Sequence, residues 1–105
     1  SSIECRINAK ASGKVNFLHI PGGPFVRFDT CLWDGYVVPP YYDSLLGKLV
    51  VQAGTREEAV RKMRAALCEL VIDGVPNNIE DQIAIIDSQD FRKGTYNLNF
   101  FQNAR

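Results

Sequence analysis

The stretch LLGKLVVQAGTREEAVRKMRAALCELVIDG, residues 45–74, decides the fold class because it places a buried strand directly before an amphipathic helix. Residues 45–53 are rich enough in Leu and Val to predict the strand. Thr55 and Glu58 form a capping-box pattern that predicts the start of a helix reaching about Val71. Apolar residues recur at helical spacing on one face of this helix, at Val60, Met63, Leu67, Leu70 and Val71. Asp73-Gly74 is expected to end it.

The residues upstream of this stretch are predicted to form strands. At the N-terminus an apolar row, Ile3, Cys5, Ile7 and Ala9, alternates with a polar row, Glu4, Arg6, Asn8 and Lys10. Two apolar runs, residues 15–20 and 25–33, flank Pro21-Gly22-Gly23-Pro24, and this pattern predicts a hairpin. Residues 36–38 form a further strand, which Pro39-Pro40 should end or place at a sheet edge.

A second helix is predicted downstream, with Asn77 or Asn78 as its N-cap and a short turn near residues 88–91. It should carry three isoleucines inward, Ile79, Ile83 and Ile86. Strands precede helices in the chain, without βαβ alternation. We therefore expect one α+β domain over residues 1–105, with an antiparallel β-sheet and two main helices packed on one side.

The composition excludes several classes of protein. The 105 residues are 46% hydrophobic, and 12 Lys and Arg balance 12 Asp and Glu. Such a chain buries roughly two thirds of its unfolded surface, so it needs neither disulfides nor a structural metal. Zero net charge argues against nucleic-acid binding. No apolar stretch approaches the roughly 20 residues of a membrane span. Three cysteines without a C-x-x-C motif fit a reducing compartment, which predicts a cytoplasmic location.

Side chains able to perform chemistry are few. His19 is the only histidine, and its strand-like setting favours a structural or surface role over base catalysis. The cysteines are expected to pack as small apolar residues at Cys5, Cys31 and Cys68. Three acidic residues lack EF-hand spacing and are interpreted as helix-surface and capping residues, Asp81, Asp87 and Asp90. Gly22-Gly23 lacks the lysine and the following helix of a phosphate-binding loop.

Two features remain open on the residues alone. Arg6 lies on the polar row of its strand, where a permanently charged guanidinium could bind an oxyanion through two N–H donors or join a surface ion pair. The segment PPYYDS, residues 39–44, is rigid and aromatic. It could close a strand-to-strand corner or form an interface.

These segments also carry a resemblance to the C-terminal domain of biotin carboxylase. The matching motifs in the first half of the chain are IECRINA at 3–9, PGGP at 21–24, VR at 26–27, GY at 35–36, VPPYYDSL at 38–45 and GKL at 47–49. Those in the second half are REEA at 56–59, MRAAL at 63–67, IDGV at 72–75, NI at 78–79 and DF at 90–91. The resemblance covers almost the whole chain and is to the bacterial acetyl-CoA and propionyl-CoA carboxylase type, whose product serves fatty acid biosynthesis.

The resemblance implies an ATP- and bicarbonate-dependent ligase that carboxylates biotin on a carrier protein. In that family the arginine of the ECRINA segment binds biotin and stabilises the enolate oxygen that forms on deprotonation of the ureido nitrogen, which by position assigns Arg6 as the catalytic and biotin-binding residue. Arg27 and Asp43 fall on positions of a homodimer interface. Leu98 matches a position near the adenine of bound ATP. The implied partners are the ATP-grasp portion of the same enzyme, the biotin carboxyl carrier protein and a second subunit.

The chain also departs from the family pattern. Lys10-Ala11-Ser12 runs directly into Gly13-Lys14, where the family usually has Glu and a longer loop, and Pro76-Asn77 replaces a usual Lys-Thr. The ATP-grasp portion, which holds the phosphate-binding lysines, metal-binding glutamates and bicarbonate site, is absent. We therefore expect these 105 residues to bind no ATP and Mg productively and to be inactive alone.

Three functions follow from these observations. The first is the C-terminal lobe of a biotin carboxylase, supplying one arginine and a subunit contact. The second is a non-catalytic interaction module that retains the fold, which the short loop and Lys10 favour. The third, remote, is a small enzyme built on His19.

Overall fold

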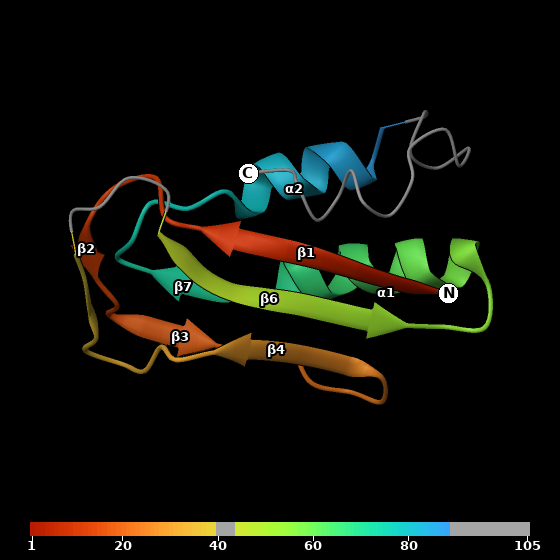
Figure 1. Cartoon of the computed structure of the whole chain (residues 1–105), viewed down its shortest axis with the longest axis horizontal. Coiled ribbons are helices and arrows are strands. Elements are labelled where there is room, and N and C mark those ends of the chain that lie inside the picture. The colour runs from red at the N-terminus through yellow and green to blue at the C-terminus, as the bar shows by residue number, and fades with distance from the viewer. Residues whose placement is uncertain (40–43, 89–105) are drawn as a thin grey trace.

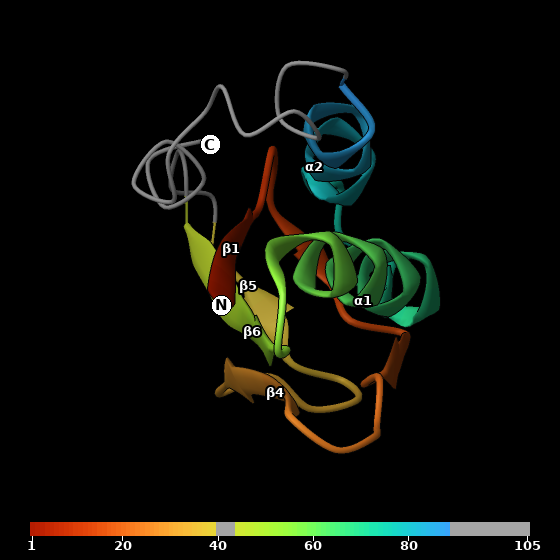
Figure 2. The ribbon, with the colours of Figure 1, turned by 90° about the vertical axis from the view of Figure 1, so that its right-hand side faces the viewer.

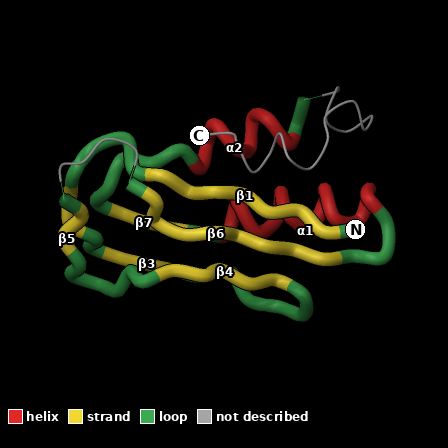
Figure 3. Tube along the Cα trace, viewed as in Figure 1, coloured by secondary structure: helices red, strands yellow, loops and turns green. Residues whose placement is uncertain are grey.

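Strand β6 (Leu45–Gln52) is the central strand of a three-stranded sheet, and its run of Leu and Val fits this buried position. It lies between β1 (Ser2–Asn8) and β4 (Val26–Thr30) and pairs antiparallel with both. The computed structural model describes residues 1–39 and 44–88. Its other elements are β2 (Gly13–Lys14), β3 (Phe17–His19), β5 (Val37–Val38), α1 (Arg56–Glu69), β7 (Val71–Asp73) and α2 (Ile79–Ile86). Antiparallel strands and two helices confirm the α+β class (Figures 1 and 3).

The predicted hairpin between residues 15–20 and 25–33 is wrong. Strand β3 pairs with β7, and β4 pairs with β6, so the Gly- and Pro-rich turn carries the chain from one sheet to another. The backbone at Gly23 has φ 123°, a positive value that glycine adopts readily, and the chain changes direction in this turn after β3. Pairing with β7 places Leu18 opposite the buried Ile72, so burial against a distant strand determines the partner of β3.

Helix α1 begins as its capping pattern predicts, because Thr55 Oγ1 accepts a hydrogen bond of 3.2 Å from the N–H of Glu58. It ends at Glu69, earlier than Val71, because Leu70 is extended and the next residues form β7. Its buried residues face β1 and β6 and are Ala59, Val60, Met63, Ala66 and Leu67. Figure 2 shows α1 on one face of the three-stranded sheet.

Helix α2 packs with Ile86 fully buried and with Ile79 and Ile83 partly buried against the core, as expected. Asn78 occupies its N-cap position, but the side chain of Asn78 makes no capping bond. Asn77 Oδ1 instead accepts a hydrogen bond of 3.0 Å from the N–H of Ile79. Asn78 is therefore available for a different contact. The turn predicted near residues 88–91 lies almost wholly outside the described residues.

The core lies between the sheet and α1, and it contains the apolar row of β1. Ile3, Cys5 and Ile7 are at most 1% exposed. Burial, with a smaller contribution from Glu4, raises the pKa of the Cys5 thiol far above its usual range. Cys31 and Cys68 are exposed, so the prediction that they pack as apolar residues is wrong. Neither α1 nor α2, nor any other helix in the described part of the chain, is long and apolar enough to cross a membrane.

Candidate functional site

Arg6 lies on the face of the three-stranded sheet that is turned away from α1. The alternation of β1 buries Cys5 and Ile7 against the helix and sends Arg6 to the other side, where it is partly exposed. The pairing register places Lys48 of β6 directly opposite Arg6, and Asp29 of β4 opposite Lys48. Arg6, Lys48 and Asp29 therefore form one row across this face.

Arg27 lies on the same face, in the neighbouring row with Val50 and Glu4. Its Nε lies 3.0 and 3.1 Å from the two carboxylate oxygens of Asp29. This pair neutralises Asp29 within its own strand. No ion pair among the described residues joins Arg6 to Glu4 or to Asp29, and Arg6 Nε is buried without a hydrogen-bond partner in this part of the chain.

The electrostatics of the row favour an anion. Like charges directly opposite on neighbouring strands repel each other unless a negative group lies between them or beside them. Arg6 and Lys48 occupy such positions, and the carboxylate nearest in the row, Asp29, is paired with Arg27. A guanidinium in this setting can donate two parallel N–H bonds to an oxyanion.

The main chain of Arg6 is held from the other side by α2. The carbonyl oxygen of Arg6 accepts hydrogen bonds from Gln82 Nε2 at 3.0 Å and from Asn78 Nδ2 at 3.2 Å. Asn78 Oδ1 also accepts a bond of 2.8 Å from the N–H of Asn8. Figures 1 and 2 show α2 beside β1, on the side away from β6. Both amide side chains are almost fully buried, with exposures of 2% for Asn78 and 1% for Gln82.

The sequence interpretation missed the role of Asn78 and Gln82. They are four residues apart, and this spacing places them on the same side of α2. Buried amides at that spacing are a signal for a polar contact with a neighbouring backbone, because a buried polar group requires a hydrogen-bond partner. Burial is not visible in the sequence, so Asn78 could be interpreted there only as a cap.

The shortened connection after β1 is tied to the start of α2. Lys10 donates its N–H to the carbonyl of Pro76 at 2.8 Å, and its Nζ lies 2.7 Å from Asp81 Oδ2. Ala9 forms an isolated β-bridge with Asn77. The chain therefore continues from β1 toward the start of α2. The short connection already gives the backbone N–H of Lys10 a hydrogen-bond partner, so a longer loop is not required for that purpose.

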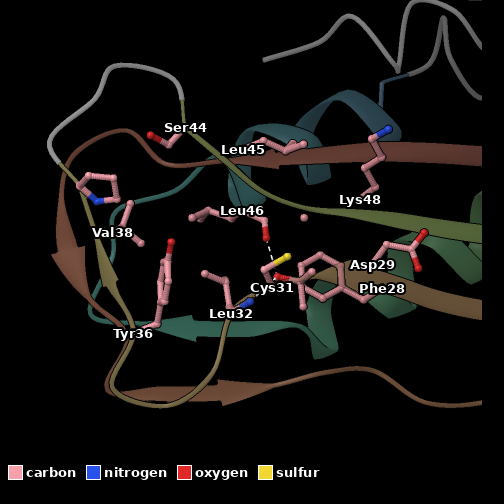
Figure 4. A pocket seen from close by; sticks show the side chains of 13 residues that line it. Phe28, Asp29, Cys31, Leu32, Tyr36, Val38, Ser44, Leu45, Leu46 and Lys48 are labelled. Atoms are coloured by element: carbon pink, nitrogen blue, oxygen red, sulfur yellow. Dashed lines mark hydrogen bonds between the residues drawn. The ribbon is translucent and has the colours of Figure 1, made fainter.

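A cavity of about 660 Å³ lies next to the row, between the end of β4 and the beginning of β6. Figure 4 shows Asp29 and Lys48 at one end of it and Tyr36 and Val38 at the other. Thr30 Oγ1 donates to the carbonyl of Leu46 at 2.5 Å and fixes the wall of the cavity. Arg6 does not line it, so the cavity and the arginine are neighbours that share Lys48.

The other candidate residues behave as surface groups where the structure describes them. His19 is exposed and lies 3.8 Å from Glu69. Asp87 forms an ion pair with Arg64 at 2.8 Å. The described residues contain no group of three His, Cys, Asp or Glu that could hold a metal ion. Asp43, Asp90 and Leu98 lie outside the described residues.

The described residues thus place an arginine on the sheet face turned away from α1, with its main chain held by α2. A guanidinium in such a position can bind an oxyanion. Residues 4–103 match the family described as the biotin carboxylase C-terminal domain, and the chain belongs to that family.

Similar proteins agree with this assignment. The chain is 44% identical to biotin carboxylase of Haemophilus influenzae over 96% of its own length and 24% of the relative. It is 46% identical to the chloroplastic biotin carboxylase of Arabidopsis thaliana, over 94% of its length and 20% of the relative. The chain therefore spans about a quarter or less of the curated relatives that it matches.

Solved structures agree as well. The biotin carboxylase domain dimer of Hydrogenobacter thermophilus 2-oxoglutarate carboxylase, solved with MgADP and bicarbonate, is 38% identical, with a TM-score of 0.86 over 96% of this chain and 24% of that one. Pyruvate carboxylase of Rhizobium etli is 28% identical, with a TM-score of 0.85 over 97% of this chain and 11% of that one. The expected fold is confirmed.

Proposed function

We propose that this chain is the C-terminal lobe of a biotin carboxylase and that Arg6 acts on the biotin of a carrier protein. The observation that carries the proposal is the position of Arg6: it stands in a segment that matches the family, and it lies on the sheet face away from α1 without a carboxylate partner among the described residues. The remainder of the active site would come from the ATP-grasp portion of the same enzyme.

The role proposed for Arg6 is electrostatic. Biotin becomes a nucleophile when its ureido N–H loses a proton to a base, and the electron pair then delocalises onto the ureido oxygen. The guanidinium of Arg6 would donate two N–H bonds to that oxygen as its negative charge develops. A cation held in place before the reaction lowers such a barrier because little reorganisation is needed. Lys48, in the same row, would add to the positive potential at this oxygen.

The phosphates of ATP and the Mg are expected to bind outside this chain. The described residues hold no metal-binding group of acidic side chains, and the two glycines after Pro21 do not form a phosphate loop. Leu98 stays a proposed contact with adenine, and Arg27 and Asp43 stay proposed contacts with a second subunit. The similar structure from Hydrogenobacter thermophilus is a dimer, which supports the second proposal.

The acyl-CoA context is also a proposal. Structures similar to this chain come from 2-oxoglutarate and pyruvate carboxylases, so the fold is compatible with several final acceptors. The cytoplasmic location stays a prediction from the cysteines.

The function can be tested by bicarbonate-dependent ATP hydrolysis with free biotin. The 105 residues alone should give no turnover, because one arginine supplies neither the nucleotide site nor the base. Measurable turnover by the isolated chain would contradict the proposal. The reading frame upstream of Ser1 separates the proposal from the interaction module: an ATP-grasp region there supports the enzyme, and a start codon just upstream of Ser1 supports the module.

A further inference from the structure

Helix α2 contacts the edge of β1 through hydrogen bonds from two buried amide side chains. Strand β1 is an edge strand, since β6 is its one neighbour in the described sheet. The backbone groups of Arg6 and Asn8 that point away from β6 would face solvent or an apolar helix. They are instead bonded by Asn78 and Gln82, two buried amides from α2.

We propose that Asn78 and Gln82 are positioning residues for Arg6, forming an amide clamp that fixes the strand from which the guanidinium projects. This inference rests on the proposed function of Arg6 for its catalytic consequence. The clamp itself is defined by three hydrogen bonds, of 3.0, 3.2 and 2.8 Å, to the backbone of Arg6 and Asn8.

The local geometry explains why a clamp is needed at this point. The pairing register of β1 and β6 shifts between Ile7 and Asn8, one residue beyond Arg6. Such an irregularity leaves one residue unpaired and increases the local twist, so the ladder alone holds the strand less firmly there. The carbonyl of Arg6 receives two donors from α2 within one residue of this shift.

The side chain of Arg6 depends on its backbone for placement. Among the described residues, Arg6 Nε has no hydrogen-bond partner, and no ion pair holds the guanidinium. A displacement of about 1 Å can cost a catalytic group as much as 100-fold in rate. Two donors on the Arg6 carbonyl restrict that displacement without occupying the N–H groups that would meet an oxyanion.

The chain offers a matched pair of variants and a control. Gln82→Met keeps the length and volume of the side chain but removes the donor to Arg6. Asn78→Asp keeps an acceptor for the N–H of Asn8 and turns a carboxylate oxygen toward the Arg6 carbonyl. Asn77→Ala is the control, because the side chain of Asn77 bonds Val75 and Ile79 and makes no hydrogen bond to β1 in the described part of the chain.

The first measurement is the ¹⁵N order parameter of the Arg6 Nε–H and of the neighbouring backbone amides in the 105-residue chain. We expect the order parameter to fall in Gln82→Met and Asn78→Asp and to stay unchanged in Asn77→Ala. Asn77→Ala should lower the unfolding midpoint, because it removes the bonds to Val75 and Ile79, so it controls for a general loss of stability. Unchanged Arg6 order in both clamp variants would overturn the clamp, whatever Arg6 does in catalysis.

The second measurement is biotin carboxylation by the full-length enzyme that carries this chain. Gln82→Met should lower kcat by about 10-fold or more, with the KM for ATP unchanged, whereas Asn77→Ala should keep its kcat. An unchanged kcat in Gln82→Met, beside an Arg6→Ala variant that has lost activity, would overturn the positioning role. If Arg6→Ala itself keeps full activity, the proposed function fails, and the order parameters still decide whether the clamp exists.

Discussion

Arg6 combines a main chain held by α2 with a guanidinium that has no ion-pair partner among the described residues, and this combination separates it from Arg27 on the same face. Arg27 is paired with Asp29 within one strand, an exposed contact of the kind that contributes about 0.2–1 kcal/mol. Arg6 has no such carboxylate partner among the described residues. A surface ion pair was the alternative interpretation of Arg6 in the sequence, and the described residues do not support it.

Cys5 gives a prediction at the scale of one residue. Burial raises its thiol pKa, so the folded protein keeps a proton that the unfolded chain loses above about pH 8.5. Stability from this residue is full below that pH and falls by about 1.4 kcal/mol for each further pH unit. Urea unfolding of the wild type and of Cys5→Val from pH 7 to 10.5 should therefore show curves that diverge above pH 8.5. Parallel curves would show that the thiol is not protected.

Thiol labelling checks the same burial independently. Cys31 and Cys68 are exposed and Cys5 is buried. A thiol reagent at pH 8 should modify Cys31 and Cys68 quickly and Cys5 only on unfolding. Fast labelling of a third thiol in the folded protein would contradict the placement of Cys5.

The helices and strands are determined partly by local sequence signals and partly by contacts between residues far apart in the chain. The capping pattern at Thr55 and the Leu- and Val-rich run of β6 are local, and both were predictable from the sequence. The pairing partner of β3 was not predictable, because a Gly- and Pro-rich turn indicates that the chain changes direction but does not indicate with which strand β3 pairs. The clamp was missed for the same reason, since its bonds join residues 70, 72 and 76 positions apart.

The start of α1 can be tested through its cap. Thr55→Ala removes the acceptor for the N–H of Glu58 and should lower the free energy of unfolding by about 1 kcal/mol. Ser12→Ala, at an exposed position, is the control and should change it by less than about 0.5 kcal/mol. Equal effects of the two substitutions in urea unfolding would argue against a capping role.

The antiparallel pairing of β4 with β6 leaves no room for a side chain at Gly47. A Cβ at this position would collide with the ring of Phe28 and approach the carbonyl oxygen of Asp29. Gly47→Ala should therefore destabilise the protein by about 1–3 kcal/mol, the usual cost of overpacking. Gly22→Ala, where a Cβ meets no neighbour within 4 Å, should be nearly neutral. Combining Gly47→Ala with Phe28→Leu should recover part of the loss. No recovery would show that the ring is not the obstacle.

At the scale of the whole molecule, the described parts form a biotin carboxylase C-terminal domain, in which α2 holds the main chain of Arg6. Zero net charge fits the role that we propose, since a lobe whose substrate came on a carrier protein would not need to attract an anion by itself. The family could be inferred from motifs spread along the chain, and the match over residues 4–103 confirms it. The ion pair that follows the short loop, between Lys10 and Asp81, could not be inferred from the sequence, because it depends on how β1 and α2 are placed relative to each other.

The most direct test of the central claim is a chimera in which residues 1–105 replace the matching C-terminal quarter of Haemophilus influenzae biotin carboxylase. The claim predicts that the chimera carboxylates biotin and that Arg6→Ala lowers kcat by about 100-fold or more, with the KM for ATP unchanged. A folded chimera whose rate does not depend on Arg6 would contradict the claim that this lobe supplies the arginine of the reaction.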